Sequence, residues 1–300
     1  MTRARATGLG SLAVALWSLL ALLTVRAGAT PPFQLTALCL AIGALCGGLW
    51  ARLSHRPIPV RLPLRIWALG VFGLFGYHFA YFTALQNAPA AEAGLIAYLW
   101  PLLIVLFSGL LPGERLRPLH LIGALAAFAG AALILAPAAA GFAPEHVSGF
   151  AAALACALLW SGYSVLSRLA GYVPTEAVAG FCAVGAVLSA LCALILETPV
   201  WPATTGQWLA VAALGAGPMG LAFYVWDVGV KRGDIQLLGT AAYAAPILST
   251  LALAAAGEAQ ATPALILAAL LIAGGAALAA RGAHKALSEN EKGAPDRTRP

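Results

Sequence analysis

Long apolar runs dominate this chain of 300 residues and decide what it can fold into. The length of each run is close to the roughly 20 helical residues that are needed to cross a hydrocarbon core of about 30 Å. The chain is 61% hydrophobic and only 9% charged, too little charge for a soluble domain of this length. The segments lack the alternating pattern of barrel strands. The sequence therefore predicts an all-α membrane protein with ten transmembrane helices, over residues 7–26, 33–51, 65–86, 91–111, 118–136, 148–168, 175–196, 206–230, 235–256 and 263–281.

The basic residues alternate between the two sides of these spans. If the N-terminus is cytoplasmic, 16 of the 17 Lys and Arg residues fall in segments on the cytoplasmic side, and Arg26 alone falls outside. Basic loops are retained on that side of a membrane. We therefore expect both termini to be cytoplasmic and the protein to be a multi-pass component of a bacterial inner membrane. This placement also argues against a nucleic-acid partner, although the net charge is +6.

The two ends of the chain need separate interpretations. Arg3 and Arg5, an apolar stretch and Ala27-Gly28-Ala29 together have features of a cleaved signal peptide. That stretch is long for a signal, and the internal repeat requires it, so we expect it to remain as a helix. The polar tail, residues 282–300, contains Pro and Gly and is expected to be disordered and cytoplasmic.

Short motifs recur between the two halves at offsets of 143 to 145 residues. The matching pairs are Ala15-Leu16-Trp17-Ser18 with Leu158-Leu159-Trp160-Ser161, Tyr98-x-x-Pro101 with Tyr243-x-x-Pro246, Gly113-Glu114 with Gly257-Glu258, and residues 121–134 with 265–278. Because each half holds five spans, the second enters the membrane from the opposite side. The sequence thus predicts two inverted five-helix repeats, 1–136 and 148–281, joined by an extracytoplasmic loop at 137–147. This architecture is typical of secondary transporters.

These motifs resemble the drug/metabolite transporter superfamily, with two EamA-type halves. The resemblance rests on the two Tyr-x-x-Pro helices, each followed by a Gly-Glu turn and an Ala/Gly-rich closing helix, and it covers about residues 7–281. The aromatic set looks most like that of bacterial aromatic amino-acid exporters of the YddG type; it comprises Tyr77, His78, Tyr81, Tyr98, Trp100 and Trp160. The resemblance implies export as the direction of transport.

The tryptophans divide by depth into two groups. Trp50, Trp67, Trp201 and Trp208 fall near span ends, where aromatic belts form. Trp17, Trp100 and Trp160 fall near span centres. There an indole N–H needs a partner that hydrocarbon does not offer. They should face a wet cavity or, alternatively, pack between helices. In the third span, positions 77, 78 and 81 can share one helical face. The candidate substrate-binding residues are Trp17, Tyr77, His78, Tyr81, Tyr98, Trp100, Trp160, Tyr163 and Tyr243.

Few ionisable groups lie inside the spans. His78 is either a neutral histidine bonded to a tyrosine or carbonyl, or a substrate or proton site. Glu92 is either a solvated entry residue or an acid at a helix N-terminus. Asp227 and Lys231 have the spacing of a local ion pair. We expect no metal and no cofactor, because no second ligand has suitable spacing. The cysteines read as small apolar filler; they are Cys39, Cys46, Cys156, Cys182 and Cys192.

Proline explains how one helix can present both Tyr98 and Trp100, which lie about 200° apart on an ideal helix. Pro101 removes a backbone hydrogen bond and can kink or unwind the helix, and Pro246 provides the equivalent break. We therefore predict a break at these prolines, with Trp100 facing a cavity. Gly217 and Pro218 belong to a GxGxxG string inside an apolar run, which indicates a bend rather than a dinucleotide site.

The combined features predict a monomeric transporter that exports small aromatic metabolites, specifically aromatic amino acids, through a central aromatic-lined cavity by alternating access. A small-molecule substrate and the lipid bilayer are its expected partners. Small amines or quaternary cations are the alternative substrates, because aromatic boxes also bind cations. A membrane-embedded enzyme or a static scaffold is disfavoured. The chain has no HExxH, no GxSxG and no intramembrane aspartate pair, so we expect no catalytic residues.

Overall fold

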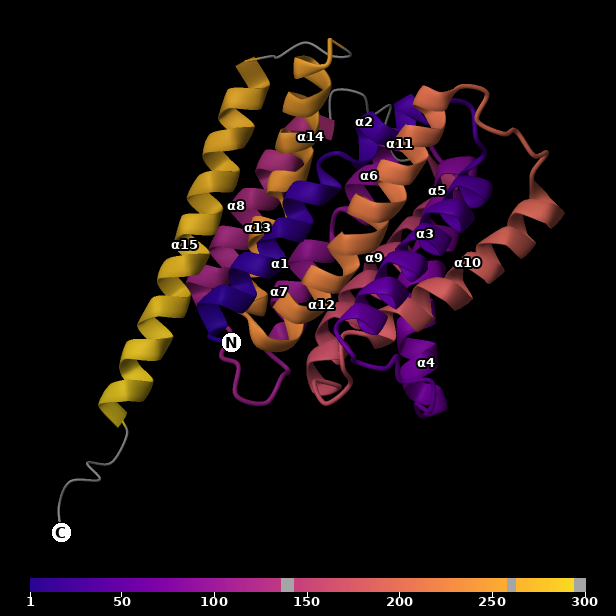
Figure 1. Cartoon of the computed structure of the whole chain (residues 1–300). Coiled ribbons are helices and arrows are strands. Elements are labelled where there is room, and N and C mark those ends of the chain that lie inside the picture. Colours follow the sequence, from indigo (N-terminus) through magenta and orange to yellow (C-terminus); the bar gives the residue numbers. More distant parts are fainter. Residues whose placement is uncertain (136–142, 258–262, 294–300) are drawn as a thin grey trace.

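The computed structural model describes residues 1–135, 143–257 and 263–293. Within them the chain forms a bundle of helices without a strand (Figure 1). The helices are α1 (Arg3–Trp17), α2 (Leu20–Arg26), α3 (Pro32–Leu53), α4 (Leu64–Val71), α5 (Tyr77–Asn87), α6 (Ala90–Ala97), α7 (Trp100–Ser108), α8 (Pro118–Leu135), α9 (Val147–Leu169), α10 (Ala177–Leu196), α11 (Thr205–Ala216), α12 (Ala222–Arg232), α13 (Ile235–Ala241), α14 (Ala244–Ala255) and α15 (Pro263–Gly293). Two π-helical segments, η1 (Phe72–Gly76) and η4 (Gly217–Leu221), and a 3₁₀ turn, η3 (Pro144–His146), complete the described elements.

Eight segments of the described chain are long and apolar enough to cross a membrane. Each consists of one helix or of consecutive elements such as α1 with α2 or α6 with α7. Two shorter apolar helices, Pro118–Leu133 and Ile266–Gly282, lie where the fifth and tenth spans are predicted. The all-helical, multi-pass character expected from the apolar runs is confirmed.

Three spans are interrupted near their centres. The fourth breaks between α6 and α7, directly before Pro101, and the ninth breaks between α13 and α14, directly before Pro246. Both breaks are as predicted, because a proline cannot donate to the carbonyl one turn earlier. The first span also breaks, at Ser18 and Leu19, where no proline marks the site. The Ser18 hydroxyl donates to the Ala15 carbonyl at 2.6 Å, a local bond that competes with the helix ladder.

The third and eighth spans each contain a π-helical segment in place of a straight helix. In the eighth span this segment is η4, which includes the predicted bend residues Gly217 and Pro218. In the third span it is η1, immediately before Tyr77. π segments widen the helix and leave carbonyls open to other partners, so they often occur at functional sites.

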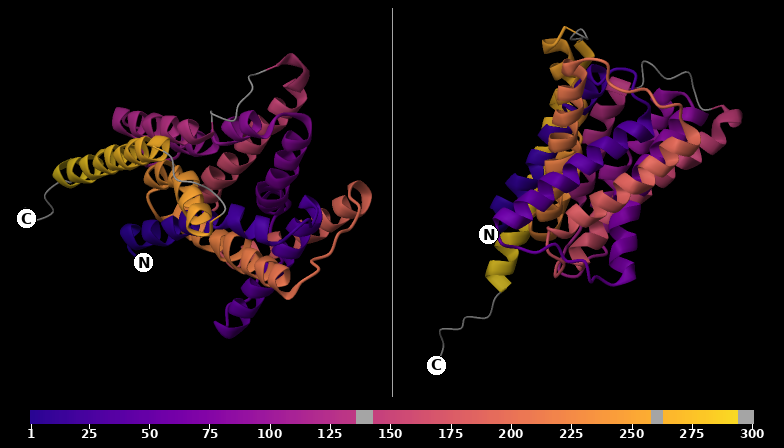
Figure 2. Two further views of the ribbon diagram at one scale, coloured as in Figure 1. Left: turned by 90° about the horizontal axis from the view of Figure 1, so that it is seen from above. Right: turned by 45° about the vertical axis from the view of Figure 1, so that its right-hand side comes forward.

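The helices pair across the two halves of the chain. α1 packs along α12, α3 along α10, α5 along α9, and α8 along α15. The last pair, magenta α8 and yellow α15, lies at one side of the bundle in Figure 1 and in the left view of Figure 2. Glycines allow the closest approaches: a Cβ on Gly229 would lie 2.6 Å from the Gly10 Cα. Such contacts between small residues are how helices pack tightly in lipid. The start of α1 and the end of α15 lie at the same, lower end of the bundle in Figure 1.

The C-terminal segment differs from the expectation. The tail predicted to be disordered from residue 282 is helical up to Gly293, because α15 continues beyond the apolar run. Residues 281–292 include Ala, Glu, Lys, Arg and Leu, good helix formers that prolong a helix already nucleated. Residues 294–300 of the tail lie outside the described chain, as do residues 137–142 of the expected loop between the halves.

Candidate functional site

Four tryptophans from four helices meet inside the bundle. They are Trp17 of α1, Trp100 of α7, Trp160 of α9 and Trp226 of α12. Ring centroids are 5.1 Å apart between Trp17 and Trp226, 5.5 Å between Trp17 and Trp160, and 6.0 Å between Trp17 and Trp100. Most pairs are edge-to-face or tilted, the arrangement that aromatic quadrupoles favour. We call these four residues the tryptophan cluster.

Two indole N–H groups of the tryptophan cluster have partners in neighbouring helices. Trp17 Nε1 donates to the Pro218 carbonyl at 3.1 Å, inside η4. Trp226 Nε1 donates to Ser164 Oγ at 3.0 Å. The bond to Pro218 connects α1 to the irregular part of the eighth span. A rearrangement of η4 would therefore either move Trp17 or break this bond.

Trp100 is only 8% exposed, and its ring packs against Trp17, Trp160 and Trp226. It does not face lipid. In this structure the Trp100 ring is packed between helices. A cavity in front of Trp100 therefore remains a prediction, which applies to another conformation of the protein.

The third span supplies the aromatic residues beside the tryptophan cluster. Tyr77 lies 5.5 Å from Trp160 and stacks on Tyr81 at 6.2 Å, centroid to centroid. His78 is buried, and its Nδ1 lies 2.7 Å from the Leu74 carbonyl. Because a carbonyl only accepts, Nδ1 carries a proton, and in the neutral ring Nε2 is then the acceptor nitrogen. The carbonyl-bonded alternative for His78 is thus the geometry found.

Tyr163 joins the tryptophan cluster, whereas Tyr98 and Tyr243 form a separate group. The ring centroids of Tyr163 and Trp160 are 5.4 Å apart. Tyr243 is fully buried, and its hydroxyl accepts the backbone N–H of Leu102 at 3.1 Å. That N–H lies in the first turn of α7, where backbone donors lack helical partners. Tyr243 therefore ties one helix break to the other, and Tyr98 packs against the small buried cluster to which Tyr243 belongs.

Trp226 is the site residue that sequence reasoning missed. It lies near the end of its predicted span, so depth alone did not place it centrally. The internal repeat held the signal, because an offset of 145 residues pairs Trp226 with Tyr81. Trp226 has no exposed surface.

Ion pairs tie together the end of the bundle that carries the N-terminus. Arg3 lies 3.3 Å from Glu114 and 3.4 Å from Asp234, and Arg168 pairs directly with Glu114. Arg168 Nη1 also donates to the carbonyls of Val230 and Gly233, at 2.8 and 2.9 Å. We call Arg3, Glu114, Arg168 and Asp234 the ionic network. It joins α1, the segment after α7, the end of α9 and the turn before α13.

Two acids inside the spans have clear settings. The predicted pair of Asp227 and Lys231 is confirmed at 2.8 Å, with both side chains almost fully buried. The Thr175 hydroxyl donates to the same carboxylate at 2.7 Å. Glu92 is completely buried in the first turn of α6, so the solvated alternative is wrong and the helix N-terminal one stands.

The other predicted groups are placed as follows. Trp50, Trp201 and Trp208 are exposed near helix ends, whereas Trp67 packs on Phe181 at 5.5 Å. All five cysteines are free, and three of them are buried. Within the described residues, no group of three or more His, Cys, Asp or Glu could hold a metal ion.

Comparisons with known proteins agree with this architecture. A family model described as the EamA-like transporter family matches residues 5–136 and 147–281. A protein of Ancylobacter novellus named aromatic amino acid exporter YddG is 56% identical over 288 residues, which cover 93% of this chain and 98% of that protein. A protein of Salmonella typhimurium with the same name is 28% identical over 269 residues, 83% of this chain and 88% of that one.

A crystal structure with 56% sequence identity has a TM-score of 0.90 and covers 94% of this chain and 100% of the other. The two family matches correspond closely to the predicted halves, 1–136 and 148–281. This chain is therefore a multi-pass membrane protein that belongs to the EamA-like transporter family, as the resemblance of its motifs predicted.

Proposed function

We propose that this protein is a secondary transporter, not an enzyme, that exports aromatic amino acids across a bacterial inner membrane. The tryptophan cluster with Tyr77 beside it carries the proposal. A substrate ring can replace one edge-to-face contact between tryptophans with little loss of energy, because aromatic rings share a negative face and a positive edge. A substrate ammonium can lie over an indole face. The names of the relatives, aromatic amino acid exporters, support the same substrate class.

Alternating access would follow from two inverted repeats. The pairing of helices supports them, because α1 against α12 and α9 against α5 are the same pair of spans seen from either half. The segments η1 and η4 begin 145 residues apart, an offset that the motifs share. Two such halves exchange conformations, and this exchange opens the site to one side and then to the other.

The ionic network would close the cytoplasmic side in the conformation described here. This assignment follows from the basic segments, which place both termini and the network in the cytoplasm. Opening to the cytoplasm requires the contacts of Glu114 with Arg3 and Arg168 to break. Export then begins when a cytoplasmic substrate enters the opened site and its ring separates the tryptophans.

The steps of binding depend on groups that the structure already orients. The donor bond from Trp17 to Pro218 would break or shift when η4 rearranges, and the freed indole N–H could then donate to a substrate carboxylate. The Nε2 acceptor of His78 and the tyrosine hydroxyls would orient the amino group. Pro101, Pro246, Gly217 and Pro218 are the proposed hinges. A monomer contains the whole proposed pathway.

Small amines and quaternary cations remain the second candidate class, because indole faces bind cations as well as rings. Counterflow of labelled phenylalanine in proteoliposomes separates the two classes, with tyrosine, tryptophan and tetraethylammonium as competitors. We expect tyrosine and tryptophan to compete and tetraethylammonium not to compete. Transport of labelled tetraethylammonium without transport of phenylalanine would overturn the substrate assignment.

A further inference from the structure

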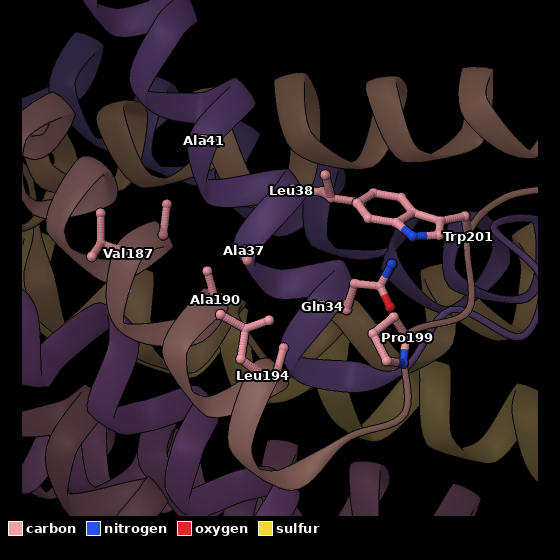
Figure 3. A pocket seen from close by; sticks show the side chains of 11 residues that line it. Gln34, Ala37, Leu38, Ala41, Val187, Ala190, Leu194, Pro199 and Trp201 are labelled. Carbon is pink, nitrogen blue, oxygen red and sulfur yellow. The ribbon is translucent and has the colours of Figure 1, made fainter.

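A groove of about 410 Å³ lies between α3 and α10, at the surface of the bundle (Figure 3). Its volume is within the range of about 300–1,000 Å³ that small-ligand sites occupy. Alanines from both helices line the groove, among them Ala37 and Ala41 of α3 and Ala190 of α10, and their small side chains leave this space open. Its walls are otherwise Leu, Val and Pro, with Gln34 and Trp201 as the polar exceptions.

The surroundings of the groove determine what can fill it. Both α3 and α10 are long and apolar enough to cross the membrane, and Val187 and Leu194 at the rim are exposed. The groove therefore opens to hydrocarbon rather than to water. In that medium the abundant molecule of the right shape and polarity is a lipid acyl chain.

At one end of the groove, the side-chain amide of Gln34 has a hydrogen-bond donor that lacks an acceptor among the described residues. Gln34 is 7% exposed, and its Oε1 accepts the Val200 N–H at 3.0 Å. That bond fixes which end of the amide is nitrogen. Nε2 is buried and has no hydrogen-bond partner in the described part of the chain. A buried donor without a partner costs about 1–3 kcal/mol, so an incoming carbonyl would be stabilised here.

Trp201 covers this amide. Figure 3 shows the nitrogen of Gln34 pointing toward the Trp201 ring. Trp201 is 60% exposed, so its ring can turn aside when a ligand enters. Tryptophans gather at the level of lipid head groups, where glycerol ester carbonyls also lie. The acceptor that meets Gln34 at this depth is therefore an ester carbonyl at the top of an acyl chain.

The charges near this end select the head group. The carboxylate of Glu197 accepts the N–H groups of Phe33 and Gln34, at 2.7 and 2.9 Å. The described residues that line the groove include no basic side chain. An anionic head group would be repelled by this carboxylate and would find no basic side chain in the described lining, whereas an ammonium would be attracted.

We propose that one amine-headed phospholipid binds between α3 and α10. Its acyl chain fills the groove, its ester carbonyl accepts from Gln34 Nε2, and its ammonium lies toward Glu197. Because α3 and α10 belong to different family matches, the lipid bridges the two halves of the protein. This site needs only the membrane setting of the chain and is independent of the substrate that the protein exports.

Native mass spectrometry of delipidated protein tests the site with dioleoyl phosphatidylethanolamine or dioleoyl phosphatidylglycerol. Ala190→Phe fills the groove, and Ala183→Phe is the matched control on an exposed part of α10 outside the lining. Gln34→Met removes the amide donor at similar length. We expect the wild type and Ala183→Phe to bind the ethanolamine lipid at least tenfold more tightly than the glycerol lipid. Binding should be lost in Ala190→Phe and weakened at least threefold in Gln34→Met.

Equal binding of both lipids, or equal binding by all variants, overturns the proposal. A second measurement does not use the Ala190→Phe variant, in which a side chain fills the groove. Ethanolamine lipid with brominated acyl chains should quench wild-type tryptophan fluorescence more than it quenches Trp201→Phe. No difference between these two proteins would also contradict the site. Neither measurement uses transport, so their failure is distinct from failure of the proposed function.

Discussion

Replacing Glu114 by glutamine tests whether the ionic network holds the cytoplasmic side closed. Glutamine keeps the shape of the side chain and removes its charge. Glu114 is the shared partner of Arg3 and Arg168, and its side chain is 6% exposed. In the variant, the guanidinium of Arg168 keeps its bonds to the Val230 and Gly233 carbonyls but loses its counter-charge.

The size of the effect follows from burial. Breaking a buried ion pair by removing one partner costs about 3–5 kcal/mol. Because Arg168 retains its hydrogen bonds to the two carbonyls, we expect the loss of its pair with Glu114 to cost less than this, about 2–3 kcal/mol. The pair with Arg3 adds less than about 1 kcal/mol, because the Arg3 side chain is 40% exposed. If the network exists only in the cytoplasm-closed state, this energy shifts the equilibrium about 30- to 150-fold toward cytoplasmic opening.

Cysteine labelling measures that shift. A single cysteine replaces Thr240, which is fully buried on α13, in a background without the native cysteines. Inverted membrane vesicles expose the cytoplasmic side to an impermeant maleimide. We expect Glu114→Gln to accelerate labelling at least tenfold. Glu176→Gln is the matched control, since it removes the charge of another buried glutamate whose partner, Arg56, is 74% exposed and lies outside the ionic network. Equal labelling rates in Glu114→Gln and Glu176→Gln would refute the reasoning.

Two further predictions concern stability and are measured by thermal unfolding in detergent. Gly10→Ala should lower stability by about 1–3 kcal/mol, because its Cβ would lie 2.9 Å from the Gly229 Cα, whereas Gly8→Ala should not, since nothing lies within 4 Å; equal melting temperatures would contradict this. Lys231→Met leaves Asp227 buried without its cation and should cost about 3–5 kcal/mol, and adding Asp227→Asn should restore most of the loss. A double variant no more stable than the single one would argue against a charge effect.

Local rules predicted much of the fold from the sequence. Apolar runs, proline chemistry and the spacing of Asp227 and Lys231 act within one helix, and each was sufficient for its prediction. Pro101 and Pro246 break their helices because the missing N–H is a property of the residue itself. The break at Ser18 has no such marker, and nothing in the sequence singled it out.

The candidate site depends on contacts that no local pattern contains. Trp226 reaches the centre of the bundle because α12 packs along α1 and α9, so its depth could not be measured from the end of its span. The ionic network joins Arg3 to Glu114, residues 111 positions apart in sequence. Tyr243 was placed among the substrate residues by its motif, and its capping bond to Leu102 emerges only when the two broken helices meet.

Efflux of labelled phenylalanine from proteoliposomes tests the central claim most directly, with Trp100→Ala measured beside the wild type. Trp208→Ala is the matched control, because Trp208 is an exposed tryptophan that stacks on Trp201 away from the tryptophan cluster. We predict efflux by the wild type and by Trp208→Ala, and at least a tenfold loss in Trp100→Ala. Folded wild-type protein that gives no flux above empty liposomes, or a Trp100→Ala variant that transports as well as Trp208→Ala, would contradict the account.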